Sequence, residues 1–367
     1  MKIPAHILAL IVACSIPALA HHSMAAMYDD KKPITLKGAI TKFDWTNPHA
    51  FIFLDVPDAR GNAVNWAVEL PSRIDLKRDG WTQESASIGE TVSIEGSLAR
   101  DGSKQIEGKV VTLANGKKLS AAPMPFPKVA AAPAKPAPRW PDGHIRLGRQ
   151  PGETGYWTST AASVMEETGS NVLMSADGLL ANIADAGKVA PFQPWAKGLY
   201  EYRQKTLLKD DPMQACLPPG GPRQFQVPYG IRIEEQPDNK RIFVFSGGGN
   251  RNWRLIHLDN RAHQPEDLTP TYYGDSVGKW EGDTLVIDTL GFNERFWFSN
   301  GGLPHTENLH LTERLSRPDY NILKYEVRVD DPGAYTRPWS ASWNLQWVPG
   351  QDIEEYFCDE YNRDIGR

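Results

Sequence analysis

Hydrophobic and polar positions alternate in short runs along most of the chain, which predicts β-strands in place of long helices. After an apolar leader, three such runs cover 34–45, 50–56 and 63–70, and two more cover 91–98 and 106–113. Period-two alternation places successive side chains on opposite faces of a strand. Between the third and fourth runs, Ser72 is a candidate helix cap, with Ile74 and Leu76 on a short helical turn.

Three strands, a helix and two further strands follow the order of an OB-type Greek-key barrel. We therefore predict an OB-like β domain over residues 21–120. Many OB barrels bind nucleic acid through a basic surface, but this region holds thirteen Lys/Arg and thirteen Asp/Glu. The whole chain carries a formal charge of −5 over 367 residues, so a nucleic-acid partner is not expected.

The segment 121–141, "AAPMPFPKVAAAPAKPAPRWP", holds seven prolines in 21 residues. Proline lacks the backbone donor that helices and central strands need. We interpret this segment as a semi-extended Pro/Ala linker between the OB-like unit and a second domain over 142–367.

The second domain is predicted to begin with a helical segment and continue as strands. Apolar residues recur at helical spacing over 190–208, with the helix starting near Pro194. From Arg223 onward, runs such as "RIFVFSG", "ILKYEVRVDD", "SASWNLQWV" and "IEEYFCDEY" read as successive strands joined by hairpin turns. Closing such a meander into an antiparallel β-barrel removes its exposed edges. "GDSVGKWEGDTLVIDT" resembles hairpins of lipocalin-like (calycin) barrels, so we favour that fold over a β-sandwich.

The N-terminus has the features of a secretory signal peptide. Residues 1–20, "MKIPAHILALIVACSIPALA", combine a Lys near the start, an apolar stretch too short for a permanent span and an Ala-Leu-Ala cleavage site. We expect a periplasmic or secreted protein with no stable membrane anchor. Cleavage removes Cys14, and the remaining pair, Cys216 and Cys358, is most simply a disulfide in an oxidising compartment.

Several long strings resemble a group of exported bacterial proteins to which no activity is assigned. They are "AHHSMAAMYD", "TNPHAFIFLDV", "DPMQACLPPGGPRQF", "PTYYGDSVGKWEGDTLVIDTLGFN" and "PHTENLHLTERLSRPD". In that group the N-terminal part is a domain of unknown function. The resemblance implies export and a two-unit organisation, and it carries over no catalytic residue.

Titratable residues are dense in "LPHTENLHLTER", residues 303–314. The spacing His-x-Glu-x-x-His differs from the helical motif of zinc proteases. On a strand, His305, Glu307 and Glu313 would face one way, and His310 and Arg314 the other. A single metal site is therefore disfavoured, and a solvated polar strand face is the plainest interpretation.

Acid–base chemistry in the barrel is the functional interpretation of the same region. We expect His305 and Glu307 with Asp288, or His310 and Arg314 with Asp275, to share a site, because histidine titrates near neutrality. A small ligand would be held by the substrate-binding candidates Tyr273, Trp280, Trp297 and Arg314. The alternatives are an Asp288 paired with an arginine at an edge, and tryptophans that simply fill the core.

A second candidate lies at the mature N-terminus. Cleavage after Ala20 would leave His21 and His22 first, and His49 begins the second strand. A terminal amine with imidazoles suits Cu or Zn, and the alternative is a terminus with two incidental histidines.

The function expected from the sequence is small-molecule binding by an exported β-barrel protein. Turnover as an acid–base hydrolase, lyase or isomerase on a small apolar or aromatic compound would use the barrel. The competing hypothesis is a non-catalytic periplasmic metal- or ligand-binding protein. Whether a metal is bound and the oligomeric state stay open at this point.

Overall fold

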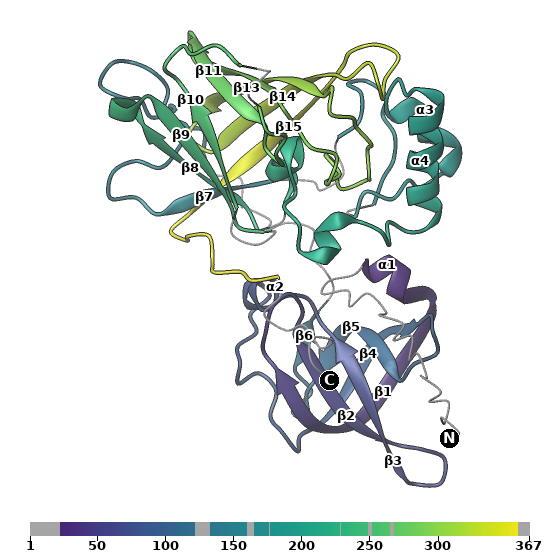
Figure 1. The fold of residues 1–367 in the computed structure, drawn as a ribbon. Coiled ribbons are helices and arrows are strands. Elements are labelled where there is room, and N and C mark those ends of the chain that lie inside the picture. The colour runs from purple at the N-terminus through teal and green to yellow at the C-terminus, as the bar shows by residue number, and fades with distance from the viewer. Residues whose placement is uncertain are drawn as a thin grey trace, which may run out of the picture.

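Two β bodies make up the molecule (Figure 1). The computed structural model describes residues 23–121, 133–159, 165–175, 177–227, 229–248, 252–264 and 268–358. The first part of the chain forms a six-stranded sheet, and the second forms a closed nine-stranded barrel. The predicted signal peptide lies outside the described residues.

The N-terminal body contains every strand that the alternation predicts. Its elements are α1 (Met24–Met27), β1 (Tyr28–Asp44), β2 (Phe51–Pro57), β3 (Ala63–Glu69), α2 (Arg73–Arg78), β4 (Thr91–Ala99), β5 (Gln105–Thr112) and the short β6 (Lys118–Ser120). The predicted cap is confirmed, because the Ser72 hydroxyl accepts the Asp75 backbone N–H at 3.1 Å. The strand order is β3-β2-β1-β4-β5-β6, and a parallel contact between β3 and β5 curls the sheet onto its own core.

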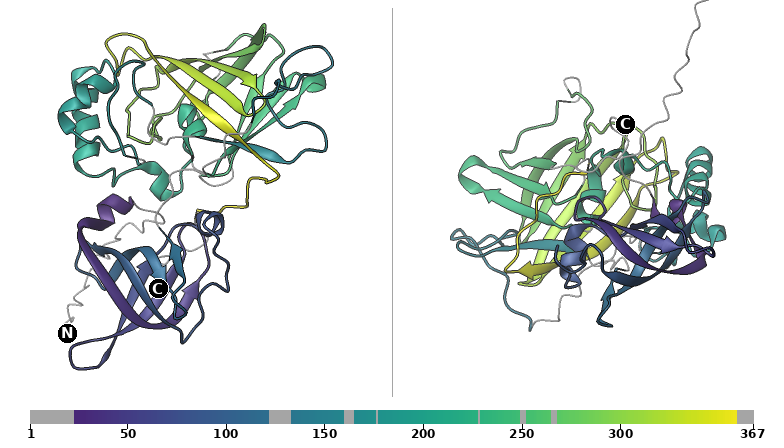
Figure 2. Two further views of the ribbon diagram at one scale, coloured as in Figure 1. Left: turned by 180° about the vertical axis from the view of Figure 1, so that it is seen from behind. Right: turned by 90° about the horizontal axis from the view of Figure 1, so that it is seen from below.

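The C-terminal body is built from the remaining elements. They are β7 (Gly155–Ser159), η1 (Ile183–Asp185), α3 (Ala186–Val189), α4 (Pro194–Lys205), η2 (Pro212–Ala215), η3 (Gly221–Gln226), β8 (Ile231–Gln236), η4 (Pro237–Asn239), β9 (Arg241–Ser246), β10 (Trp253–His257), β11 (Asp275–Glu281), β12 (Thr284–Leu290), β13 (His310–Asp319), β14 (Ile322–Asp330) and β15 (Trp339–Pro349). The predicted helix starting at Pro194 is confirmed as α4, which lies with α3 beside the barrel (Figure 2).

The barrel closes in the order β10-β11-β12-β13-β14-β15-β7-β8-β9. A closed barrel is found in place of the alternative sandwich, but it is not a pure meander. β10 and β11 pair in parallel, so the chain between them must travel back along the barrel before β11 begins. The strand predicted for 353–361 is wrong where it is described, since 351–357 are irregular, and β7 replaces it in closing the barrel between β15 and β8.

Side chains fill the barrel interior. The six-residue segment η3 enters it, where Phe225 stacks on Tyr325 with ring centroids 4.3 Å apart. The Gln224 side-chain amide donates to the Val244 carbonyl at 3.0 Å. Trp157 and Trp347 meet edge to face at 5.0 Å and are almost fully buried. The interior is thus a packed core, so a site that a ligand can reach lies on the outer face of the barrel or at its ends.

The chain returns to the N-terminal body after β15. Residues Gln351–Cys358, here called the strap, run from the barrel toward α2 (Figure 1). The predicted disulfide between Cys216 and Cys358 is confirmed, with Cα atoms 5.5 Å apart. Lys77 on α2 pairs with Glu354 of the strap at 2.9 Å. The strap therefore ties α2 to the barrel body.

The described end of the Pro/Ala segment, 133–141, packs on the barrel. The Lys135 carbonyl accepts the Tyr320 backbone N–H at 2.8 Å, and Arg139 forms a two-pronged ion pair with Asp283 at 2.7 and 2.8 Å. Within the described ranges, no helix is both long and apolar enough to cross a bilayer.

Candidate functional site

A line of alternating carboxylates and imidazoles runs across the outer face of the barrel. Asp275 begins β11, Asp288 lies in β12 and His310 begins β13. Alternation along these strands turns all three side chains outward, because their neighbours Ser276 and Thr289 are buried inside. Strands β11, β12 and β13 are hydrogen-bonded neighbours, so the three residues gather on one patch.

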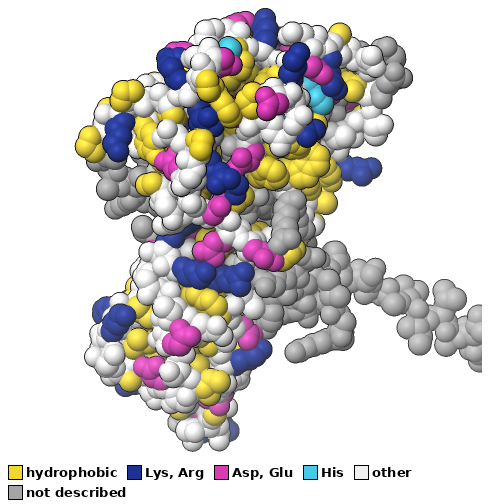
Figure 3. Space-filling view, turned by 90° about the vertical axis from the view of Figure 1, so that its left-hand side faces the viewer, with side chains coloured by type: hydrophobic (Ala, Val, Ile, Leu, Met, Phe, Trp, Pro, Cys, Tyr) yellow, Lys and Arg dark blue, Asp and Glu magenta, His cyan; other side chains and the backbone are white. Residues whose placement is uncertain are grey.

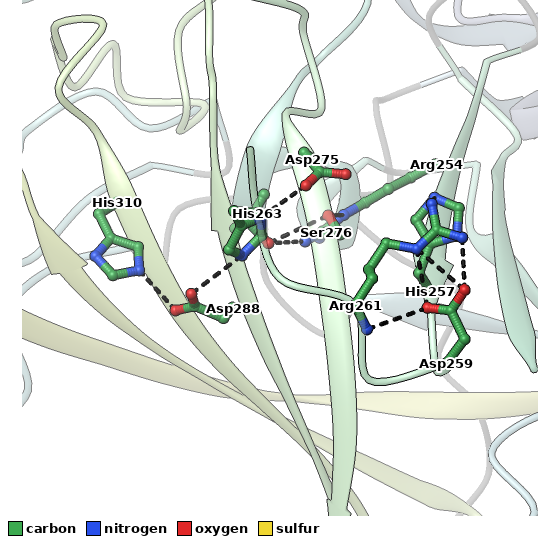
Figure 4. Close-up of polar contacts among 10 residues, drawn as sticks. Arg254, His257, Asp259, Arg261, His263, Asp275, Ser276, Asp288 and His310 are labelled. Atoms are coloured by element: carbon green, nitrogen blue, oxygen red, sulfur yellow. Dashed lines mark hydrogen bonds and ion pairs between the residues drawn. The ribbon is translucent and has the colours of Figure 1, made fainter. Parts of the chain in front are cut away.

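His263 joins these residues from the connection between β10 and β11 (Figure 4). Its Nδ1 lies 2.6 Å from Asp275 Oδ2, and its Nε2 lies 3.2 Å from Asp288 Oδ2. The other oxygen of Asp288 lies 2.6 Å from His310 Nε2. The result is an unbroken line, Asp275–His263–Asp288–His310, which we call the outer-face line.

Exposure rises along the outer-face line. The side chains of His263 and Asp275 are 14% and 22% exposed, whereas those of Asp288 and His310 are both 43% exposed. Each ring nitrogen of His263 has a carboxylate oxygen within hydrogen-bonding distance. One end of the line is thus held and shielded, and the other meets solvent.

The exposed end has the arrangement of an oriented general base. A carboxylate that accepts a hydrogen bond from one imidazole nitrogen fixes the tautomer and leaves the other nitrogen to exchange protons. Asp288 stands in that relation to His310, and His263 holds Asp288 in turn. The arrangement can take a proton from a molecule at the surface and return it.

A second polar cluster lies inside the barrel, with one residue on each of the neighbouring strands β10 to β14. Arg254 of β10 and Glu313 of β13 pair through Arg254 Nη1 and Glu313 Oε1 at 2.9 Å, and both side chains are fully buried. Ser276, Thr289 and Tyr325 complete the cluster by hydrogen bonds to the same two groups. Burial, together with the Glu313 carboxylate, raises the pKa of the Tyr325 phenol well above its usual value. The side chains of this inner cluster are shielded from solvent, and their hydrogen bonds join neighbouring strands of the barrel.

His305 and Glu307 do not join Asp288 as expected, because β13 begins at His310 and both residues precede it. His305 is buried against Phe296, and its two ring nitrogens lie 3.1 and 3.2 Å from the carbonyl oxygens of Phe296 and Thr306. Burial lowers the pKa of its imidazole. Glu307 is exposed on the loop. The pairing of Asp275 with His310 is found, but only through His263 and Asp288.

The four expected substrate-binding residues lie in separate contacts. Tyr273 donates its hydroxyl to Asn252, and Trp280 lies against His144 with ring centroids 5.4 Å apart. The Arg203 guanidinium covers the buried Trp297 at 4.4 Å, and Arg314 pairs with Glu281 at 3.1 Å. Packing accounts for the two tryptophans, which is the alternative given for them above, and ion pairing at the surface accounts for Arg314.

In the N-terminal body, His49 lies beside a buried carboxylate. Its Nδ1 is 3.3 Å from Glu69 Oε1, and Glu69 accepts the Tyr28 hydroxyl at 2.5 Å. His21 and His22, the other expected metal ligands, lie outside the described residues. Within the part of the chain that the structure describes, no group of three or more His, Cys, Asp or Glu is arranged to hold a metal ion.

His263 and Arg254 were missed by the sequence analysis. His263 stands in "NRAHQPED", a polar stretch with no strand or helix periodicity. One feature of the sequence could have indicated such a residue. Two carboxylates on the outer face of neighbouring strands need a cationic or hydrogen-bonding partner. Arg254 alternates with apolar residues in "WRLIH", and an arginine on the buried face calls for a buried carboxylate.

Fold and site together define a two-body β protein with an acid–base line on its barrel. A model described as a family of unknown function, DUF6152, matches residues 9–108. That match covers most of the N-terminal body, as the sequence resemblance implied, and none of the barrel. Searches of curated proteins and of solved structures gave no match.

Proposed function

We propose that the chain is an exported small-molecule-binding β-barrel protein and an acid–base enzyme of the hydrolase, lyase or isomerase type. The observation that carries the proposal is the outer-face line, which ends in a half-exposed imidazole oriented by a carboxylate. Its substrate is a small apolar or aromatic compound that meets the barrel from outside, since side chains fill the interior.

His310 is the proton-transfer residue of this proposal. Asp288 accepts from Nε2 and stabilises the imidazolium that forms when Nδ1 takes a proton from substrate or water. His263, held by Asp275, is a positioning residue that keeps the second oxygen of Asp288 occupied. The proton then returns from His310 to the leaving or rearranged group.

Two structural assignments belong to the same proposal. Three features support an OB-like N-terminal domain: β1 pairs with both β2 and β4, β3 pairs with β5, and α2 lies between β3 and β4 in the chain. Closure around a packed core, with eight of nine neighbouring pairs antiparallel, supports a lipocalin-like relative for the barrel. The disulfide supports export to an oxidising compartment.

A generic activated ester tests the base without knowledge of the substrate. The mature chain is incubated with p-nitrophenyl acetate, and p-nitrophenolate release is followed. His310→Gln is expected to lower the protein-catalysed rate at least tenfold, toward the ~10²-fold that general bases contribute. Asp288→Asn is expected to lower the rate by a smaller factor.

His144 provides a matched control within the chain. Its side chain is also 43% exposed and lies 3.1 Å from a carboxylate, that of Asp142, far along the chain from the outer-face line. His144→Gln is expected to keep the wild-type rate. Equal rates in the His310 and His144 variants, with unchanged circular dichroism, would remove His310 from the mechanism.

The alternative function is metal binding at the mature N-terminus. The proximity of His49 to the buried Glu69 favours it, because an imidazole and a carboxylate are both zinc and copper ligands. Elemental analysis of protein matured by export checks this. About one equivalent of copper or zinc that is lost in His49→Ala would favour the carrier function.

A further inference from the structure

A cavity of about 230 Å³ lies where the two bodies meet. Its walls come from three places: Ile74, Lys77 and Arg78 on α2, Tyr156 and Tyr229 of the barrel body, and strap residues 351–354. Figure 3 shows Lys and Arg beside Asp and Glu side chains at this junction. Sites for small molecules are often found between domains, and this one is smaller than those that hold drug-sized ligands.

Charge is divided between two walls of the cavity. The α2 wall carries the cations Lys77 and Arg78, and the strap wall carries the anions Asp352 and Glu354. Each charge has a partner at the rim: Lys77 pairs with Glu354 at 2.9 Å, and Arg232 pairs with Asp352 at 3.0 Å. These rim pairs are exposed by a quarter to a half, and such pairs contribute at most about 1 kcal/mol, so a bound ligand can replace them.

Apart from Gln351, the rest of the lining is aromatic and apolar. Tyr156 and Ile74 are 4% and 6% exposed, and Tyr229 stacks on the buried Tyr356 with ring centroids 4.7 Å apart. Asp75 holds the Arg78 guanidinium at 3.0 Å, which keeps it in place on α2. The cavity thus offers a cationic wall, an anionic wall and a rigid tyrosine floor.

We propose that this cavity binds a small zwitterion of the amino-acid type with an apolar or aromatic side chain. The carboxylate meets Arg78 and Lys77, the ammonium meets Asp352 and Glu354, and the side chain lies on the tyrosine rings. A purely anionic or purely cationic ligand leaves one charged wall without a partner, whereas a zwitterion serves both. The volume suits one amino acid.

Three compounds with one ring skeleton test the charge requirement. Isothermal titration of the mature full-length chain uses L-phenylalanine, 3-phenylpropanoate, which lacks the amine, and 2-phenylethylamine, which lacks the carboxylate. L-phenylalanine is expected to bind about tenfold more tightly than either analogue, the effect of one charge-assisted hydrogen bond. An analogue that binds as tightly as L-phenylalanine would overturn the zwitterion assignment.

Variants then place the ligand in the cavity. Lys77→Met and Asp352→Asn change one wall each, and each is expected to weaken L-phenylalanine binding about tenfold. Arg337→Met and Asp330→Asn, which alter exposed ion pairs elsewhere, are the matched controls and should bind normally. Unchanged affinity in both cavity variants, or no saturable heat with the wild-type chain, would contradict the proposal.

Discussion

The barrel wall carries one polar cluster on its inner face and another on its outer face, and the two differ in burial. Inside, Arg254 and Glu313 are fully buried, and Tyr325 donates to Glu313 at 2.6 Å. Outside, the outer-face line begins in the shielded pair Asp275–His263 and ends in the half-exposed His310. Similar groups thus become a closed structural cluster on one face and an open acid–base line on the other. Access to solvent separates the two clusters, since only the outer-face line keeps groups that solvent reaches.

Breaking the inner cluster is expected to cause the largest loss of stability. Arg254→Met leaves the Glu313 carboxylate buried without its guanidinium, and such a change costs about 3–5 kcal/mol of unfolding free energy. Urea unfolding followed by tryptophan fluorescence measures the loss. Arg314→Met, one residue beyond Glu313 on the outer face, is the control and should cost less than about 1 kcal/mol. Equal losses would mean that burial does not separate the two faces.

A buried carboxylate without an arginine sharpens the comparison. Glu107 is 7% exposed, its nearest cation is Lys109 Nζ at 4.0 Å, and burial raises its pKa to about 7. The folded state then holds a proton that the unfolded chain has released, so stability falls as the pH rises from about 4.5 to about 7. Glu107→Gln should therefore stabilise the protein by about 2–3 kcal/mol at pH 8 and hardly at all near pH 4.

Urea unfolding of the wild type and Glu107→Gln at the two pH values measures this difference. Glu107→Gln changes neither the barrel nor the outer-face line, so ester hydrolysis by this variant should stay at the wild-type rate. A variant that is less stable than the wild type at pH 8 would show that the Glu107 carboxylate is well paired as an anion.

The smallest expected effect on stability falls on the outer-face line itself. Asp288→Asn removes a 43% exposed charge between two imidazoles, so its unfolding free energy should change by less than about 1 kcal/mol. The ester hydrolysis described above should nevertheless fall. A large loss of stability would class the outer-face line with the inner cluster, as a structural group.

Local patterns in the sequence predict local structure well in this chain. The N-terminal strands, α2 with its Ser72 cap and α4 with its leading proline all follow from periodicity and capping chemistry within a few residues. The disulfide agrees with a prediction from the cysteine count, since two cysteines would remain after the expected cleavage. These features depend on neighbours in sequence or on composition.

The candidate site depends on distant pairings, which no local pattern encodes. Asp275 and His310 were singled out together, yet their link passes through His263, whose position depends on the parallel pairing of β10 with β11. His305 was placed on a strand by alternation that starts five residues before the strand itself. Barrel closure decided which carboxylates and imidazoles meet, and closure joins segments up to 194 residues apart, as Pro349 and Gly155 show.

The strap follows the last barrel strand in the chain, which has a consequence for the order in which the two bodies fold during synthesis. A chain emerging N-terminus first can complete its six-stranded sheet early, because all strands of that sheet precede Ala121. The barrel cannot close until β15, its last strand, has been made. The strap cannot join α2 to the barrel body until Glu354 and Cys358 have followed. The first body can thus fold before the barrel, which remains open at two edges until β15 has been made.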